Sequence, residues 1–139
     1  MGYSFTDPRL LTRALTRLAY AGEQGFGPAA HMDALATLGD AVIDVVVIQS
    51  LVAVGEHDKG LITTKKTNCV NMTVLRRLAE QMSVEDYVYW GKGEEAQAVW
   101  RSGRVLAECM EALIGAVYLD GGIGAASQVL ETIGLRCEI

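Results

Sequence analysis

Acidic side chains inside apolar stretches are the residues in this sequence most suited to chemistry. The run "LATLGDAVIDVVV", residues 35–47, contains Asp40 and Asp44, and Asp33 precedes it. On a helix Asp33 and Asp40 lie two turns apart and Asp40 and Asp44 one turn apart, so each pair shares a face. Burial of an ionised carboxylate is costly unless it is paired or binds a metal. Gly39, beside Asp40, weakens a helix by about 1 kcal/mol relative to alanine.

A second acidic pair lies in the apolar run 105–119, where Glu108 and Glu111 share a helix face at i, i+3 spacing. If the two helices cross, these carboxylates converge with Asp40 on a hard cation such as Mg²⁺, which prefers oxygen ligands. Such a site suits phosphodiester cleavage, because the metal generates hydroxide and stabilises the attacking and leaving oxygens. The alternative is that these acids are solvated or form hydrogen bonds between helices, because both spacings are common.

The elements that must position these acids are helices. Hydrophobic periodicity and end signals predict an all-α fold. The expected helices cover 6–21, about 30–54, 61–82, 98–119 and 123–135. Glycine-rich or polar segments at 22–30 and 55–60 predict loops, 83–97 predicts a turn region, and Asp120–Gly122 predicts a helix end. The length fits a single domain over residues 1–139.

Composition narrows the function classes. Half of the residues are hydrophobic, which argues against disorder, and no uninterrupted apolar run reaches the roughly 18 residues of a membrane span. The net charge of −5 argues against nucleic-acid binding by the chain as a whole, but allows a local basic rim. The cysteines Cys69, Cys109 and Cys137 predict neither a disulfide framework nor a CxxC metal pair. A reducing compartment, and hence a cytoplasmic location, is the simplest expectation.

Three separated stretches resemble the ribonuclease III family. They are the opening "YSFTDPRLLTRALTRLAYAGE" (3–23), the "LGDAV" run within 35–47, and "VLAECMEALIGAVYLDGG" (105–122). The turn "YVYWGKGEE" (87–95) also fits. The resemblance covers nearly the whole chain. It implies a helical bundle that forms a homodimer and cuts double-stranded or structured RNA with Mg²⁺, for which Mn²⁺ substitutes.

The resemblance also implies a set of site residues. Asp40, Glu108 and Glu111 match metal ligands of the family and would activate water, although Glu108 stands where the family usually has aspartate. Asp33 matches a further acidic position and would support them.

Four positions depart from the family pattern. Ala36 stands where the family has a glutamate ligand, and Thr37 replaces an aromatic residue. Arg17 replaces a histidine, and Leu61 replaces a glutamate. The alternative function is therefore a weakened or inactive ribonuclease III fold that binds RNA or a protein partner. Ala36 is explained by a divergent branch of the family or by an engineered substitution, and the accompanying changes favour the branch.

RNA contacts need a basic rim, because double-stranded RNA is recognised through phosphates and 2′-hydroxyls. The candidates are Lys65, Lys66, Arg101 and Arg104, and the alternative for each is a solvated side chain. No separate double-stranded RNA-binding domain is expected in this chain. A metal between Asp40 and Glu111 would favour the enzyme, whereas a salt bridge from Arg101 or Arg104 in that space would favour the binding module.

Overall fold

The computed structural model describes residues 1–137, and in that range every regular element is helical, which confirms the all-α prediction. The α-helices are α1 (Pro8–Ala14), α2 (Leu18–Gln24), α3 (Asp33–Ala53), α4 (Lys59–Cys69), α5 (Met72–Gln81), α6 (Lys92–Ala96) and α7 (Gly103–Thr132). Short 3₁₀ turns lie at η1 (Pro28–Ala30), η2 (Val84–Asp86) and η3 (Val99–Arg101).

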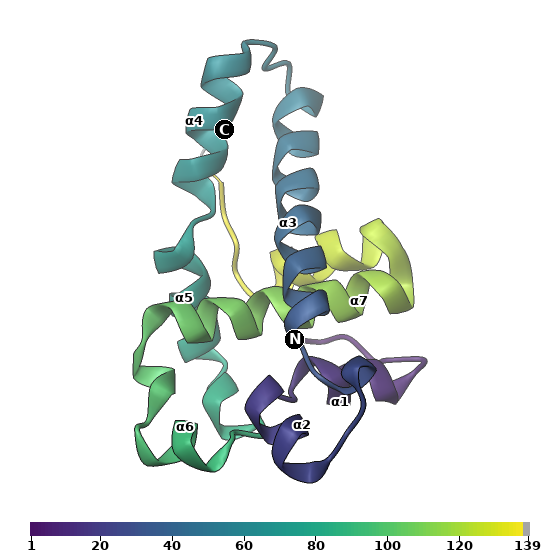
Figure 1. Ribbon diagram of the computed structural model, residues 1–139. Coiled ribbons are helices and arrows are strands. Elements are labelled where there is room, and N and C mark those ends of the chain that lie inside the picture. The colour runs from purple at the N-terminus through teal and green to yellow at the C-terminus, as the bar shows by residue number, and fades with distance from the viewer. Residues whose placement is uncertain (138–139) are drawn as a thin grey trace.

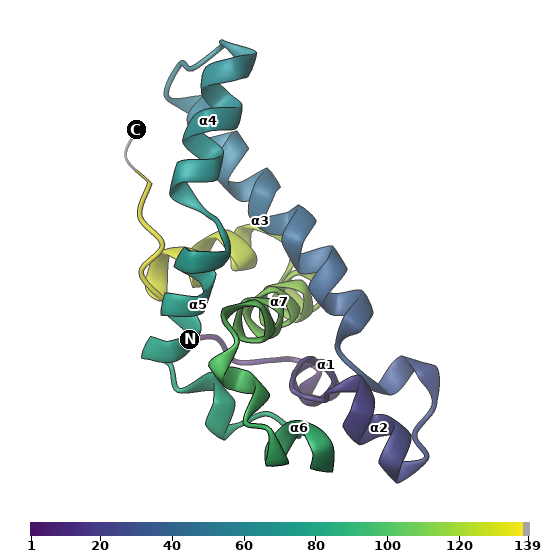
Figure 2. The same cartoon turned by 60° about the vertical axis from the view of Figure 1, so that its left-hand side comes forward.

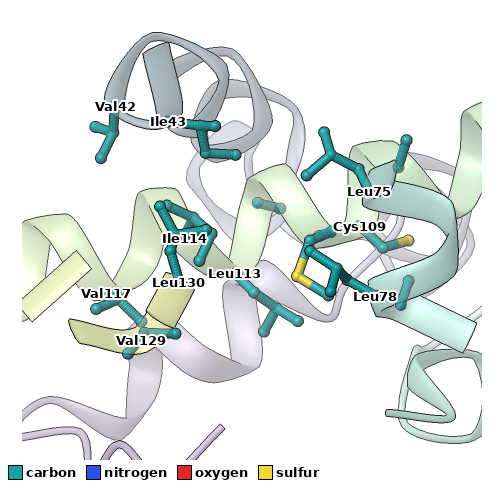
Figure 3. Packing of buried hydrophobic residues seen from close by; sticks show 14 of the residues in the cluster. Val42, Ile43, Leu75, Leu78, Cys109, Leu113, Ile114, Val117, Val129 and Leu130 are labelled. Carbon is teal, nitrogen blue, oxygen red and sulfur yellow. The ribbon is translucent and has the colours of Figure 1, made fainter. Parts of the chain in front are cut away.

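The two long helices, α3 and α7, cross at the centre of the fold. Figure 1 shows α3 rising beside α4 as a hairpin while α7 runs across its lower part, and Figure 2 views α7 nearly along its axis. Apolar side chains from α3, α5 and α7 fill the space around the crossing (Figure 3). Ile114 is fully buried there, as is Leu130 from the end of α7. The acidic helices predicted from the sequence are thus the two central helices.

Length and composition would also let α3 and α7 cross a membrane, which the sequence analysis did not expect. The structure gives both helices another role, because their apolar faces pack against each other and against α5. Helix α3 also carries Asp40 and Asp44 in its middle. We therefore describe both as core helices.

The expected opening helix over 6–21 is divided in two. Asp7 caps α1, as its position before Pro8 predicts. The chain then becomes extended at Arg17 and forms a short parallel bridge to the segment before α6. Tyr89 N donates to Leu15 O at 2.8 Å, and Arg17 N donates to Tyr89 O at 3.3 Å. This break turns the Arg17 side chain towards α7, so it has consequences for the site.

Two other predicted helices also differ from the structure. The helix expected over 61–82 breaks at Val70 and Asn71, where Asn71 caps α5 by accepting a hydrogen bond from Val74 N. The helix expected from residue 98 begins at Gly103, after the turn η3. The predicted stop after Leu119 is present as a kink, because Gly122 adopts φ 84° and interrupts α7 before its last segment.

The sequence predicts no disulfide framework, and residues 1–137 of the structure contain a single disulfide that was not expected. Cys69 at the end of α4 is paired with Cys137 as a disulfide, with their Cα atoms 4.8 Å apart. The pairing could not be foreseen because 68 positions separate these residues in the sequence. Cys109 is free and buried in the core.

Candidate active site

The site is built on an unusually close approach of α3 and α7. A Cβ atom on Gly39 would lie 1.7 Å from the carbonyl oxygen of Glu111, and one on Gly115 would lie 2.2 Å from that of Leu35. Only glycine lets the two backbones touch in this way. Asp40 follows Gly39 directly, so the same contact brings its carboxylate to Glu111. The glycine that weakens the isolated helix therefore has a packing function.

Asp40 and Glu111 form the centre of the site. Both side chains line the same two hollows, with Glu111 half-buried and Asp40 exposed. Burial of Glu111, its interaction with the Asp40 carboxyl group, and the negative charges of Asp40, Glu108 and Asp44 raise the pKa of Glu111 to about 8. The protein thus holds two carboxyl groups together against their mutual repulsion, an arrangement that attracts a cation.

Glu108 joins this pair between two hollows. The hollow of about 480 Å³ is lined by Asp40, Asp44, Glu108 and Glu111 together with cationic side chains from α4 and α7. The hollow of about 400 Å³ shares Asp40, Glu108 and Glu111 but is otherwise lined by the start of α3. Asp40, Glu108 and Glu111 are therefore open to both hollows, and we call these three residues the carboxylate ridge.

Each oxygen of Glu108 faces an arginine. Arg17 Nη1 lies 3.6 Å from Glu108 Oε2, and Arg104 Nε lies 3.5 Å from Glu108 Oε1. The Arg17 side chain is only 14% exposed, whereas that of Arg104 is 78% exposed. The Arg104 contact is an exposed pair within α7, and within residues 1–137 no salt bridge joins Arg101 or Arg104 to Asp40 or Glu111.

Asp33 and Ala36 line the smaller hollow with Asp40, Glu108 and Glu111. Ala36 is half-buried and adds no charge there. The carboxylate of Asp33 is 57% exposed and lies 3.9 Å from the His31 ring. Asp33 therefore shares the cavity but is not held in it by a close partner.

The donor set suits a divalent metal only in part. Throughout residues 1–137 no three His, Cys, Asp or Glu side chains are gathered closely enough to hold one ion. Asp40 and Glu111 fit a hard cation, because both offer carboxylate oxygens and the cavities leave room for metal-bound water. Glu108 could join them only by loosening its contacts with the arginines.

The four basic side chains predicted to bind RNA have different surroundings. Lys65 is paired with Glu56 at 2.7 Å, and Lys66 with Asp44 at 3.5 Å on the wall of the larger hollow. Arg104 lines that hollow too. Arg101 lies in η3, where its carbonyl accepts a hydrogen bond from Arg76 and its side chain is exposed. Of these four side chains, Lys65 therefore forms the shortest ion pair within the chain.

The contact of Arg17 with the site was not predicted from the sequence. Arg17 stood out there only as a departure from the family pattern, and Glu94 was given no role. In the structure Glu94 accepts hydrogen bonds from Arg17 Nη2 at 2.8 Å and Nε at 3.1 Å. The signal lay in the tertiary bridge at Thr16 and Tyr89, which no local pattern encodes.

The helical fold and the carboxylate ridge at its central crossing define a nuclease-type domain, and comparison with known proteins identifies the family. Residues 7–136 match the family described as Ribonuclease-III-like. The chain therefore belongs to the ribonuclease III family.

Similar proteins and structures agree with this family. Ribonuclease 3 of Oleidesulfovibrio alaskensis is 37% identical over 92% of this chain, and that of Bdellovibrio bacteriovorus is 38% identical over 91%. The chain spans only 56% and 54% of those two proteins. The nuclease domain of Campylobacter jejuni ribonuclease III superposes with a TM-score of 0.82 at 26% identity, covering 94% of this chain and 88% of that one.

Proposed function

We propose that this chain is a divalent-metal-dependent endoribonuclease domain that cleaves double-stranded or structured RNA as a homodimer. The observation that carries the proposal is that Asp40 and Glu111 line the same two hollows where α3 and α7 touch. Crowded carboxylates repel one another unless a cation or a proton lies between them, and the family of the chain supplies the reaction class.

Asp40 and Glu111 would hold Mg²⁺ or Mn²⁺, with Glu108 and the exposed Asp33 in support. The metal supplies a water of lowered pKa and stabilises charge on the scissile phosphate. The larger hollow, lined by Lys66 and Arg104, would receive the phosphate backbone, and the exposed Arg101 would extend this rim. Lys65 would contribute only after leaving Glu56.

Asp40→Asn is expected to abolish cleavage. It keeps the size of the side chain but removes half of the carboxylate pair, and losses of about 100-fold or more in rate are expected for a missing metal ligand. The measurement is cleavage of a long double-stranded RNA with Mg²⁺, with Mn²⁺ and with EDTA. Asp86→Asn, on an exposed turn, is the matched control. Cleavage that survives EDTA or Asp40→Asn would contradict the proposal.

The dimer is supported by an apolar stripe on the outer face of α3. Val45 is 50% exposed, Ile48 36% and Val52 48%, and their spacing places them on one side of the helix. The Campylobacter jejuni structure is described as showing structural flexibility in the region involved in dimer formation of its nuclease domain. An exposed stripe of this kind marks an interaction surface.

Val45→Lys is therefore expected to convert the dimer to a monomer, because a dimer through this stripe would bury two ammonium groups. Sedimentation velocity across a concentration series measures the change. Gln128→Lys, on the exposed side of α7 beyond its kink, adds the same charge elsewhere and should leave the assembly intact. A wild-type chain that sediments as a monomer at high micromolar concentration would refute this part of the proposal.

A second candidate is a non-catalytic module that binds RNA or a protein partner. The arginine contacts on Glu108 and the alanine at position 36 favour it, because protein cations neutralise part of the carboxylate ridge. This candidate predicts binding of double-stranded RNA that is insensitive to EDTA and to Asp40→Asn, without cleavage. The cleavage experiment above therefore separates the two functions.

A cytoplasmic location is also proposed. The Cys69–Cys137 disulfide removes the argument from unpaired cysteines. The proposed RNA substrate is what supports the location now.

A further inference from the structure

Arg17 is held in place by groups that do not belong to the carboxylate ridge. Its backbone is fixed by the bridge to Tyr89, and its Nε and Nη2 atoms donate to Glu94. Its guanidinium carbon lies 5.7 Å from the centre of the Trp90 ring, within the range of a cation–π contact. With these contacts and 14% exposure, the guanidinium has little freedom to move.

One guanidinium nitrogen remains directed at the site. Arg17 Nη1 lies 3.6 Å from Glu108 Oε2, beyond an ideal hydrogen bond but within ion-pair distance. The carboxylate of Glu108 is 40% exposed, so it is the more mobile partner. Glu108 therefore lies beside a positive charge that is held in place and largely shielded from solvent.

The effect of an arginine on Glu108 depends on how far its charge is shielded from water. Arg104 pairs with the other oxygen of Glu108 at a similar distance, but water screens a side chain that is 78% exposed. Screening is weak for the buried Arg17, whose guanidinium stays protonated at all relevant pH values. Of the two arginines, Arg17 exerts the larger effect on a cation bound at the ridge.

We propose that Arg17 is a positioning residue that competes with a divalent cation for Glu108 and so weakens metal binding at the carboxylate ridge. The inference rests on the proposed function, since it concerns the same metal. Weak metal binding would then have two causes. Position 36 lacks a carboxylate, and the guanidinium of Arg17 is fixed beside Glu108.

Direct binding of Mn²⁺ tests this inference without any RNA. Free Mn²⁺ is measured by electron paramagnetic resonance in titrations of the purified protein. Arg17→Gln is expected to tighten Mn²⁺ binding by about tenfold, because the Glu108 carboxylate is released from its ion pair and becomes available to the ion. Arg17→Lys keeps the charge and should bind Mn²⁺ like the wild type. Arg104→Gln should change the dissociation constant by less than about threefold, in line with its exposure.

A double-mutant cycle shows whether Arg17 acts through Glu108. In a Glu108→Gln background, Arg17→Gln should lose most of its effect on Mn²⁺ binding. Thermal unfolding of each variant confirms that the chain is folded, and Glu94→Gln combined with Arg17→Gln removes the unpaired Glu94 carboxylate if the single variant is unstable.

The outcomes separate this inference from the proposed function. Mn²⁺ binding by the wild type that is unchanged in Arg17→Gln, or equally changed in Arg17→Lys, would overturn the role of Arg17 alone. An effect of the same size in the Glu108→Gln background would also overturn it. If neither the wild type nor any variant bound Mn²⁺ at millimolar concentration, both the inference and the metal-dependent function would fail.

Discussion

Replacing Ala36 with glutamate is expected to raise metal-dependent cleavage of double-stranded RNA by about 100-fold, or about 2.7 kcal/mol of transition-state stabilisation. Ala36 lies one helical turn before Asp40 and lines the same hollow as Asp40, Glu108 and Glu111. The hollow of about 400 Å³ has room for a longer side chain. A carboxylate there would add an oxygen ligand and a negative charge to the hollow that Asp40, Glu108 and Glu111 line.

The expected gain has a second readout in metal binding. Ala36→Glu should tighten Mn²⁺ binding, because it adds a negative charge to the ridge. Gln128→Glu adds the same charge on the exposed side of α7 and should change neither cleavage nor binding. A chain that cuts no RNA as wild type but cuts it as Ala36→Glu would be an intact scaffold without activity. No change in either measurement would show that Ala36 is not the weak point of the site.

The helix faces that carry the acidic side chains of the site were predictable from the sequence. The spacing of Asp40, Glu108 and Glu111 places each on a defined helix face, and in the structure all three line the same two hollows. What spacing cannot give is the partner of each carboxylate. Arg17 is 91 positions from Glu108 in sequence, and it meets Glu108 only because of the bridge at Tyr89.

The fold shows the same division between local and tertiary signals. Helix α3 was predicted almost to its ends, because a long apolar run follows Asp33 and no breaker interrupts it. The break before α5 has a local signal that was overlooked, since Asn71 is a favoured N-cap residue. The break after α1 has none, because the backbone of Arg17 is extended only through its hydrogen bond to a distant segment. The disulfide likewise depends on where the chain end returns.

Gly39→Ala is expected to lower the free energy of unfolding by about 3 kcal/mol or more, the upper end of the range for overpacked cores. The new methyl group would meet backbone atoms, with the Glu111 carbonyl oxygen 1.7 Å away and the Gly115 nitrogen 3.0 Å away. Backbone cannot relieve such a contact by changing a rotamer, so α3 and α7 must separate. The loss opposes the usual gain from alanine in a helix, which is about 1 kcal/mol.

Urea denaturation of Gly39→Ala and of Gly124→Ala measures the difference. Gly124 lies in α7, the partner of α3 at the crossing, and a Cβ atom there would have no neighbour within 4 Å. Gly124→Ala should therefore be neutral or slightly stabilising. Equal stability of the two variants would mean that the helices do not touch at Gly39 in solution.

The same crossing links stability to the proposed chemistry. Gly115→Ala should destabilise the chain in the same way, because its Cβ would lie 2.2 Å from the Leu35 carbonyl oxygen. Once one methyl group has separated the helices, the second meets more space, so the double variant should lose less than the sum of the single losses. Separation also draws Asp40 away from Glu111. Variants that remain folded should therefore bind Mn²⁺ more weakly, whereas Gly124→Ala should bind it normally.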